Sequence, residues 1–172
     1  AIVDLTLKIK AVFLEASRKQ KKMGTITLSL NPFIPKPATP FQWAAMAEET
    51  ILKHRIRMIQ DGLKKIANIK INVESLRQAR IHALLSRGDD QCASVIETAL
   101  ENGWPAALRQ HKAYCDQVVY HPISPEKTLP WDFLNNRINK NFLLKEYRRA
   151  ARQKPSPACP MIDCARCKTC IV

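Results

Sequence analysis

Residues 1–30 show two patterns of apolar and polar positions, first that of a helix and then that of a strand. Apolar side chains recur at helical spacing up to Met23, and Gly24 can end the helix in a left-handed conformation. Segment 25–30 alternates apolar residues with Thr25, Thr27 and Ser29, which predicts a strand with one polar face. The predicted apolar face of the helix consists of Ile2, Leu5, Ile9, Val12, Phe13 and Ala16.

The next segments extend the alternation of helix and strand. Residues 31–40 contain four prolines, which fix φ and remove backbone donors, so we expect a stiff, extended loop. A long helix is predicted over about 41–66 and a second short strand over 69–73. Helix, strand, loop, helix and strand in this order predict an α/β fold with parallel strands. The buried stripe expected on the long helix consists of Leu52, Ile56, Ile59, Leu63 and Ile66.

The second half of the chain has helical periodicity only. Helices are predicted over about 75–86, 91–102, 105–118 and 139–152, with a proline-spaced linker at 121–130. The final residues lack periodicity. We therefore expect three parts, namely an α/β part at 1–74, a helical extension at 75–153 and a tail at 154–172.

Composition is that of an ordinary globular protein. Of the 172 residues, 46% are hydrophobic and 25% charged, and neither a long apolar run nor a signal peptide is visible. These features predict a soluble, cytoplasmic protein with no membrane partner. The first residues already lie within a helix and there is no initiator methionine, so we expect a fragment of a longer protein.

The formal net charge of +13 favours anionic partners, including RNA. The basic residues are scattered over the predicted helices, however, and solvated helix faces are the favoured explanation for them. No segment interleaves aromatic and basic residues, which weakens an RNA-binding interpretation.

Four cysteines lie close together at the end of the chain. Cys159, Cys164, Cys167 and Cys170 follow a C-x4-C-x2-C-x2-C pattern, and four thiolates on a segment without a core predict a metal site. Two successive x2 spacings without a long spacer favour a [4Fe–4S] cluster, and zinc is the alternative.

The remaining cysteines and the histidines carry no comparable signal. Cys92 and Cys115 fall within predicted helices, where a lone cysteine is usually a small buried apolar residue. The histidines have no metal-binding or catalytic spacing, so we expect structural or solvated roles for His54, His82, His111 and His121.

Segment 31–43, NPFIPKPATPFQW, resembles a segment of radical S-adenosylmethionine (SAM) proteins of the type associated with a B12-binding domain. A looser likeness holds to the methylthiotransferase branch. LLSRGDDQ at 84–91, segment 131–146 with Asn-Phe-Leu at 141–143, and the cysteine tail also agree. The resemblance therefore spans nearly the whole chain.

The resemblance implies that residues 1–66 are the last part of a partial (β/α)6, TIM-like barrel, with 25–30 as its final strand. It implies that Ser29 and Asn31 lie near bound SAM and that Lys36 meets its carboxylate or a substrate anion. The implied activity is reductive cleavage of SAM at a [4Fe–4S] cluster, followed by hydrogen abstraction from a substrate. Yet the C-x3-C-x2-C motif that holds this cluster is absent, so this chain alone should not cleave SAM.

The chain departs from the family pattern at five positions in three places. Ala38 stands where histidine or glycine is expected, and Asn136-Arg137 stands where Thr-Gly is expected. In the tail, Lys168-Thr169 replaces an expected Gly-Val, and none of these changes removes a cysteine.

Three interpretations follow. The first is the C-terminal portion of a radical SAM enzyme with an auxiliary cluster, whose N-terminal barrel half is supplied in cis or in trans. The second is a basic RNA-binding module with a small zinc knuckle in the tail. The third is a purely structural half that completes a barrel supplied by a partner chain.

Overall fold

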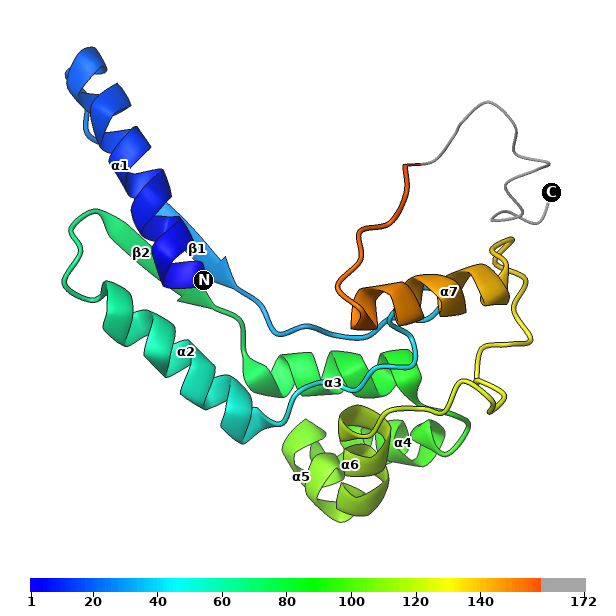
Figure 1. The fold of residues 1–172 in the computed structure, drawn as a ribbon. Coiled ribbons are helices and arrows are strands. Elements are labelled where there is room, and N and C mark those ends of the chain that lie inside the picture. Colours follow the sequence, from blue (N-terminus) through cyan, green and yellow to red (C-terminus); the bar gives the residue numbers. More distant parts are fainter. Residues whose placement is uncertain (159–172) are drawn as a thin grey trace. The chain divides into compact units, whose positions relative to one another are not determined.

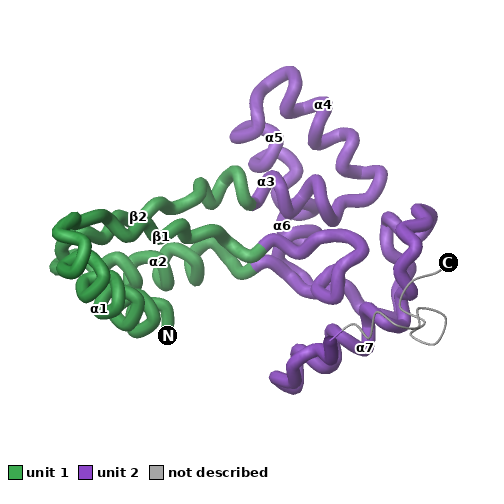
Figure 2. The backbone as a smooth tube through the Cα atoms, turned by 90° about the horizontal axis from the view of Figure 1, so that it is seen from above, with its two compact units in different colours: residues 1–33, 47–79 green, residues 34–46, 80–172 purple. Residues whose placement is uncertain are grey.

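The computed structural model describes residues 1–158, and the tail 159–172 with its four cysteines lies outside the described residues. The chain divides into two compact units, shown in green and purple in Figure 2. Unit 1 comprises residues 1–33 and 47–79, and unit 2 comprises residues 34–46 and the chain from 80 onward. Each unit is described by itself below.

Unit 1 is a small α/β arrangement (Figure 1). Its elements are α1 (Ile2–Gln20), β1 (Ile26–Leu30), α2 (Glu49–Leu63) and β2 (Ile69–Val73). The two strands pair in parallel, with Ile26 opposite Ile69 and Leu30 opposite Val73. Both predicted strands and the α/β class are thus confirmed. The two strands described do not close a barrel.

The face of α1 that packs within unit 1 is not the one predicted. The buried positions are Thr6, Lys10 and Ser17, and the Lys10 ammonium donates to the Ala67 carbonyl. Val3 lies against α2 at Gly62, where a Cβ atom would come within 3.0 Å of the Val3 Cγ2 atom. The helical spacing of apolar residues predicts that α1 has an apolar stripe, but it does not predict whether other elements of the unit cover that stripe. Most of the predicted stripe stays exposed, with Ile2 at 47%, Leu5 at 59%, Ile9 at 50% and Val12 at 69% of full exposure, whereas Phe13 is half-buried.

Helix α2 begins eight residues later than predicted, at Glu49 rather than near 41. Residues 41–43 form a turn instead, and Trp43 and Met46 are buried in unit 2. The Met46 N–H donates to the Val119 carbonyl at 3.0 Å, so this segment is anchored in unit 2 before α2 starts. The predicted stripe from Leu52 to Ile66 is buried or half-buried, as expected.

Unit 2 is helical. Its helices are α3 (Leu76–Arg87), which begins in unit 1, α4 (Cys92–Asn102), α5 (Trp104–Gln110), α6 (Lys112–Tyr120) and α7 (Lys140–Ala151). The single helix predicted over 105–118 is two helices, because the backbone turns at His111 with φ −100° and ψ 30°. His111 Nε2 lies 2.9 Å from the Thr98 hydroxyl of α4, and that hydroxyl donates to the Ser94 carbonyl.

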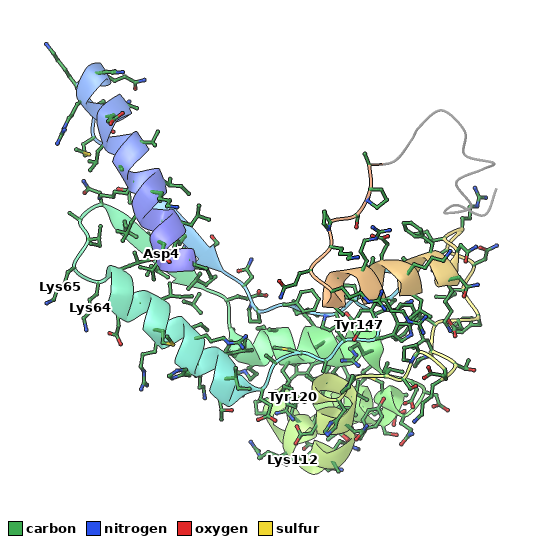
Figure 3. The ribbon with its side chains drawn as sticks, in the orientation of Figure 1. Asp4, Lys64, Lys65, Lys112, Tyr120 and Tyr147 are labelled. Carbon is green, nitrogen blue, oxygen red and sulfur yellow. The ribbon has the colours of Figure 1, made fainter. Side chains whose placement is uncertain are left out.

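The core of unit 2 joins the 34–46 segment to the last helix. Trp43, Leu129, Trp131 and Leu143 form a buried apolar cluster. Tyr147 of α7, labelled in Figure 3, packs against it with its ring centroid 5.7 Å from that of Trp43. No helix within residues 1–158 is long and apolar enough to cross a membrane.

Candidate functional site

The carboxyl end of β1 carries the first two predicted cofactor-binding residues. Ser29 is exposed and lies opposite Asn72 of β2, and exposed Asn31 follows the strand. The apolar residues of β1 and β2 point to the opposite face and are mostly half-buried. Ser29, Asn31 and Asn72 therefore offer hydroxyl and amide groups to a polar ligand at one edge of the sheet.

Lys36, the third predicted residue, belongs to unit 2 rather than unit 1. Its ammonium donates to the Ser86 hydroxyl of α3 at 3.0 Å, and its carbonyl accepts a hydrogen bond from Thr39 Oγ1 at 2.8 Å. The structure thus brings Ser29 and Asn31 together along one strand end and gives Lys36 a hydroxyl partner within the other unit.

Gln42, in the loop that carries the family resemblance, is a residue that sequence reasoning missed. Its side chain is 2% exposed, and its Oε1 atom accepts from the Ala38 N–H at 3.0 Å and from Trp131 Nε1 at 2.8 Å. One amide oxygen therefore fixes the proline-rich loop and joins it to segment 131–146. The sequence offered one indication of this contact, because both segments resemble segments of the same protein family.

Two of the departures from the family pattern fall on left-handed backbone. Ala38 has φ 56° and Arg137 has φ 57°. An L-residue with a side chain adopts this region at a cost of about 1–2 kcal/mol, whereas glycine adopts it freely. The glycine expected at 137, and the glycine that is one of the two residues expected at 38, therefore have a conformational explanation, which does not require a role in ligand binding.

The LLSRGDDQ segment forms a structural junction at the end of α3. Arg87 is buried, and its guanidinium donates to the carbonyls of Val119 and His121 at 3.3 and 2.8 Å. Burial lowers the pKa of this guanidinium. No carboxylate among residues 1–158 pairs with Arg87, so two backbone carbonyls at the end of α6 are its main partners.

Gly88 and Asp89 complete this junction. The Tyr114 hydroxyl donates to Asp89 Oδ1 at 2.7 Å, and a Cβ atom on Gly88 would come within 3.0 Å of that hydroxyl and 2.9 Å of the Cys92 Cβ atom. Burial, followed by the hydrogen bond to Asp89, raises the pKa of Tyr114 well above its usual value. Glycine is thus required here by close packing.

A partly buried ion-pair cluster links α3 to α6. Arg80 donates to Asp116 Oδ1 at 2.8 Å, and Lys112 pairs with the other carboxylate oxygen of Asp116. The Arg80 guanidinium also lies 5.8 Å from the ring centroid of Tyr120. Lys112 and Tyr120 are labelled on α6 in Figure 3. These contacts give the cluster a structural role, although the Arg80 Nε atom is buried without a hydrogen-bond partner among residues 1–158.

The predicted metal ligands Cys159, Cys164, Cys167 and Cys170 lie outside the described residues. Within residues 1–158, no group of three or more His, Cys, Asp or Glu side chains is arranged to hold a metal ion. Cys92 and Cys115 are buried free thiols, as predicted, and burial raises the pKa of both.

Comparison with known proteins finds a distant likeness to a longer archaeal protein. Over 98 residues, the chain is 30% identical to an uncharacterized protein of Methanocaldococcus jannaschii, MJ0966. The matched part is 56% of this chain but 19% of that relative, so the chain matches a small portion of a longer protein. No protein-family model matches the chain. No solved structure matches it.

Proposed function

We propose that this chain is the C-terminal portion of a radical SAM iron–sulfur enzyme and that its four-cysteine tail holds an auxiliary [4Fe–4S] cluster. The observation that carries the proposal is the position of the NPFIPKPATPFQW segment. It follows directly from a parallel strand whose polar face is exposed. In barrels built from parallel strands, loops at the carboxyl ends of strands form the ligand site.

The small sheet and the exposed helix face of unit 1 are consistent with a part of a larger barrel. Parallel strands are normally buried on both faces within sheets of several strands, whereas here two strands pair only with each other in the described residues. The apolar stripe of α1, from Ile2 to Val12, is exposed as well. Further strands and helices, supplied in cis or in trans, would cover these surfaces.

Under this proposal the residues at the end of β1 orient the cofactor. Ser29 and Asn31 would donate and accept hydrogen bonds to polar groups of SAM. Lys36, a residue of unit 2, would meet the SAM carboxylate or a substrate anion only after releasing the Ser86 hydroxyl. In a radical SAM enzyme the cofactors supply the radical chemistry, and the protein binds, orients and shields. The chain lacks the C-x3-C-x2-C motif, so SAM cleavage requires the rest of the parent enzyme.

Anaerobic analysis of iron, sulfide and zinc tests the tail assignment. The protein should contain iron and sulfide, and the Cys164→Ser/Cys167→Ser variant should lose both, because thiolates hold such clusters. Cys92→Ala/Cys115→Ala is the matched control, since it removes two buried helical cysteines and should keep the iron. Stoichiometric zinc, or no metal in the wild-type protein, would contradict the cluster.

A further inference from the structure

A pocket in unit 2 lies beside the Gln42–Trp131 contact. Its volume is about 380 Å³, within the range of small-ligand sites, and it is lined by Gln42 and by residues of segment 131–143. None of the residues assigned to SAM or to the metal belongs to this lining.

The side-chain amides of Gln42, Asn135 and Asn136, which line the pocket, use their oxygen atoms as acceptors within the protein, and their NH₂ groups have no partner among residues 1–158. The Oε1 atom of Gln42 accepts two hydrogen bonds, so its amide nitrogen is fixed as the opposite end and has no partner among residues 1–158. Asn135 Oδ1 accepts from the Arg137 N–H at 3.0 Å, and Asn136 Oδ1 accepts from the Ile138 N–H at 2.9 Å. Three NH₂ groups therefore remain for a ligand that accepts hydrogen bonds.

The pocket has little net charge. Lys140 pairs with Asp132, and the same carboxylate oxygen accepts from the Leu129 N–H at 2.8 Å. A simple anion would gain little from an ammonium group that is already neutralised. The lining favours a neutral ligand that is rich in acceptors.

An aromatic side chain completes the lining. Phe133 is 82% exposed, although a phenylalanine in a globular protein is usually buried. An exposed aromatic ring beside amide donors that have no protein partner provides a stacking surface for a planar ligand.

We propose that this pocket binds an unpaired nucleobase, with the base stacked on Phe133 and its carbonyl acceptors facing the NH₂ groups of Gln42, Asn135 and Asn136. A free nucleotide and single-stranded RNA present the same base, and the net charge of +13 would add attraction for a phosphate backbone. This inference is independent of the radical SAM proposal, because its residues all lie within unit 2 and none is a tail cysteine.

The first test is binding of fluorescent oligo(U), measured by anisotropy near physiological salt. Phe133→Ala should weaken binding about tenfold or more, the usual loss for a base-stacking side chain. Leu100→Ala is the matched control, because Leu100 is also 82% exposed but does not line the pocket. Competition by UMP at similar affinity identifies the nucleotide as the ligand, and failure of UMP to compete identifies the strand. Equal affinity of the Phe133→Ala and wild-type proteins, or no binding of either probe, would overturn the proposal.

A second test examines the donors with uridine, which carries no phosphate. Asn135→Asp keeps an oxygen for the Arg137 N–H but replaces the spare NH₂ donor by an acceptor, so uridine affinity should fall about tenfold. Asn139→Asp introduces the same charge at a nearby helix cap outside the pocket and should leave affinity unchanged. Equal effects of the two substitutions would contradict donor recognition. Iron content is expected to be the same in all these variants, which separates this test from that of the cluster.

Discussion

Trp131 donates its indole N–H to the Gln42 side-chain oxygen over 2.8 Å, although the two residues are 89 positions apart in the chain. Gln42 ends the proline-rich loop, and Trp131 begins the segment that leads to α7. Segments 31–43 and 131–146, each of which resembles a segment of radical SAM proteins, thus meet at one buried hydrogen bond.

Gln42→Leu should destabilise unit 2. The substitution leaves the buried Trp131 indole N–H without its acceptor, at a cost of about 1–3 kcal/mol, and also removes the acceptor of the half-buried Ala38 N–H. Urea unfolding followed by tryptophan fluorescence measures this loss, since Trp43, Trp104 and Trp131 all belong to unit 2. Gln110→Leu, at an exposed helix end, should change the free energy of unfolding by less than about 0.5 kcal/mol. Equal effects of the two changes would show that the contact contributes nothing.

Arg137→Gly should stabilise the protein by about 0.5–1 kcal/mol, because glycine relieves the left-handed strain at φ 57°. Ala38→Gly should act in the same direction, because φ is 56° there. Arg148→Gly makes the first change at an exposed position within α7 and should destabilise by about 1 kcal/mol. Thermal unfolding of the three variants checks the signs, and destabilisation by Arg137→Gly would refute the strain argument.

Sequence periodicity predicts well where strands and helices lie along the chain. It does not predict which face of a helix packs against the rest of the unit. The strands 26–30 and 69–73 fall where the alternation predicts them. The predicted buried face of α1 was wrong, because Thr6 and Lys10 pack within unit 1 while more apolar neighbours remain exposed. A polar residue such as Lys10 can be buried when its ammonium reaches a backbone carbonyl, and periodicity does not register that contact.

Arg87→Lys should destabilise unit 2 by about 1–3 kcal/mol. A single ammonium cannot reproduce the forked contact in which two guanidinium nitrogens donate to the carbonyls of Val119 and His121. Arg109→Lys, on the exposed side of α5, is the conservative control and should be neutral. Urea unfolding resolves the difference, and wild-type stability of the Arg87→Lys variant would rule out the forked contact as a source of stability.

The same limit applies to the candidate site. Glycine at 88 and arginine at 87 were visible as parts of a motif, but the sequence did not reveal that Tyr114 and two carbonyls contact them. Gln42 gave no signal by itself, since its role depends on a partner that is remote in the chain. Contacts of this kind require the fold.

Tyr114→Phe should lower stability by about 1 kcal/mol at neutral pH through loss of the hydrogen bond to Asp89. The pKa of Tyr114 is raised in the folded protein, mainly by burial, so above about pH 10 the unfolded chain loses this proton first. The stabilising contribution of Tyr114 is therefore present below that pH and decreases as pH rises. The difference in unfolding free energy between wild type and variant should shrink progressively as pH rises above about 10. A difference that is constant with pH would exclude this linkage.

The visible absorption spectrum of the anaerobically purified chain, before and after dithionite, tests the central claim most directly. If the cysteine tail holds a [4Fe–4S] cluster, the protein should be brown, with a broad absorption band at about 400 nm that bleaches on reduction. The same band should be missing from the Cys164→Ser/Cys167→Ser variant. A colourless wild-type protein, with or without bound zinc, would contradict the assignment of this chain to an iron–sulfur enzyme.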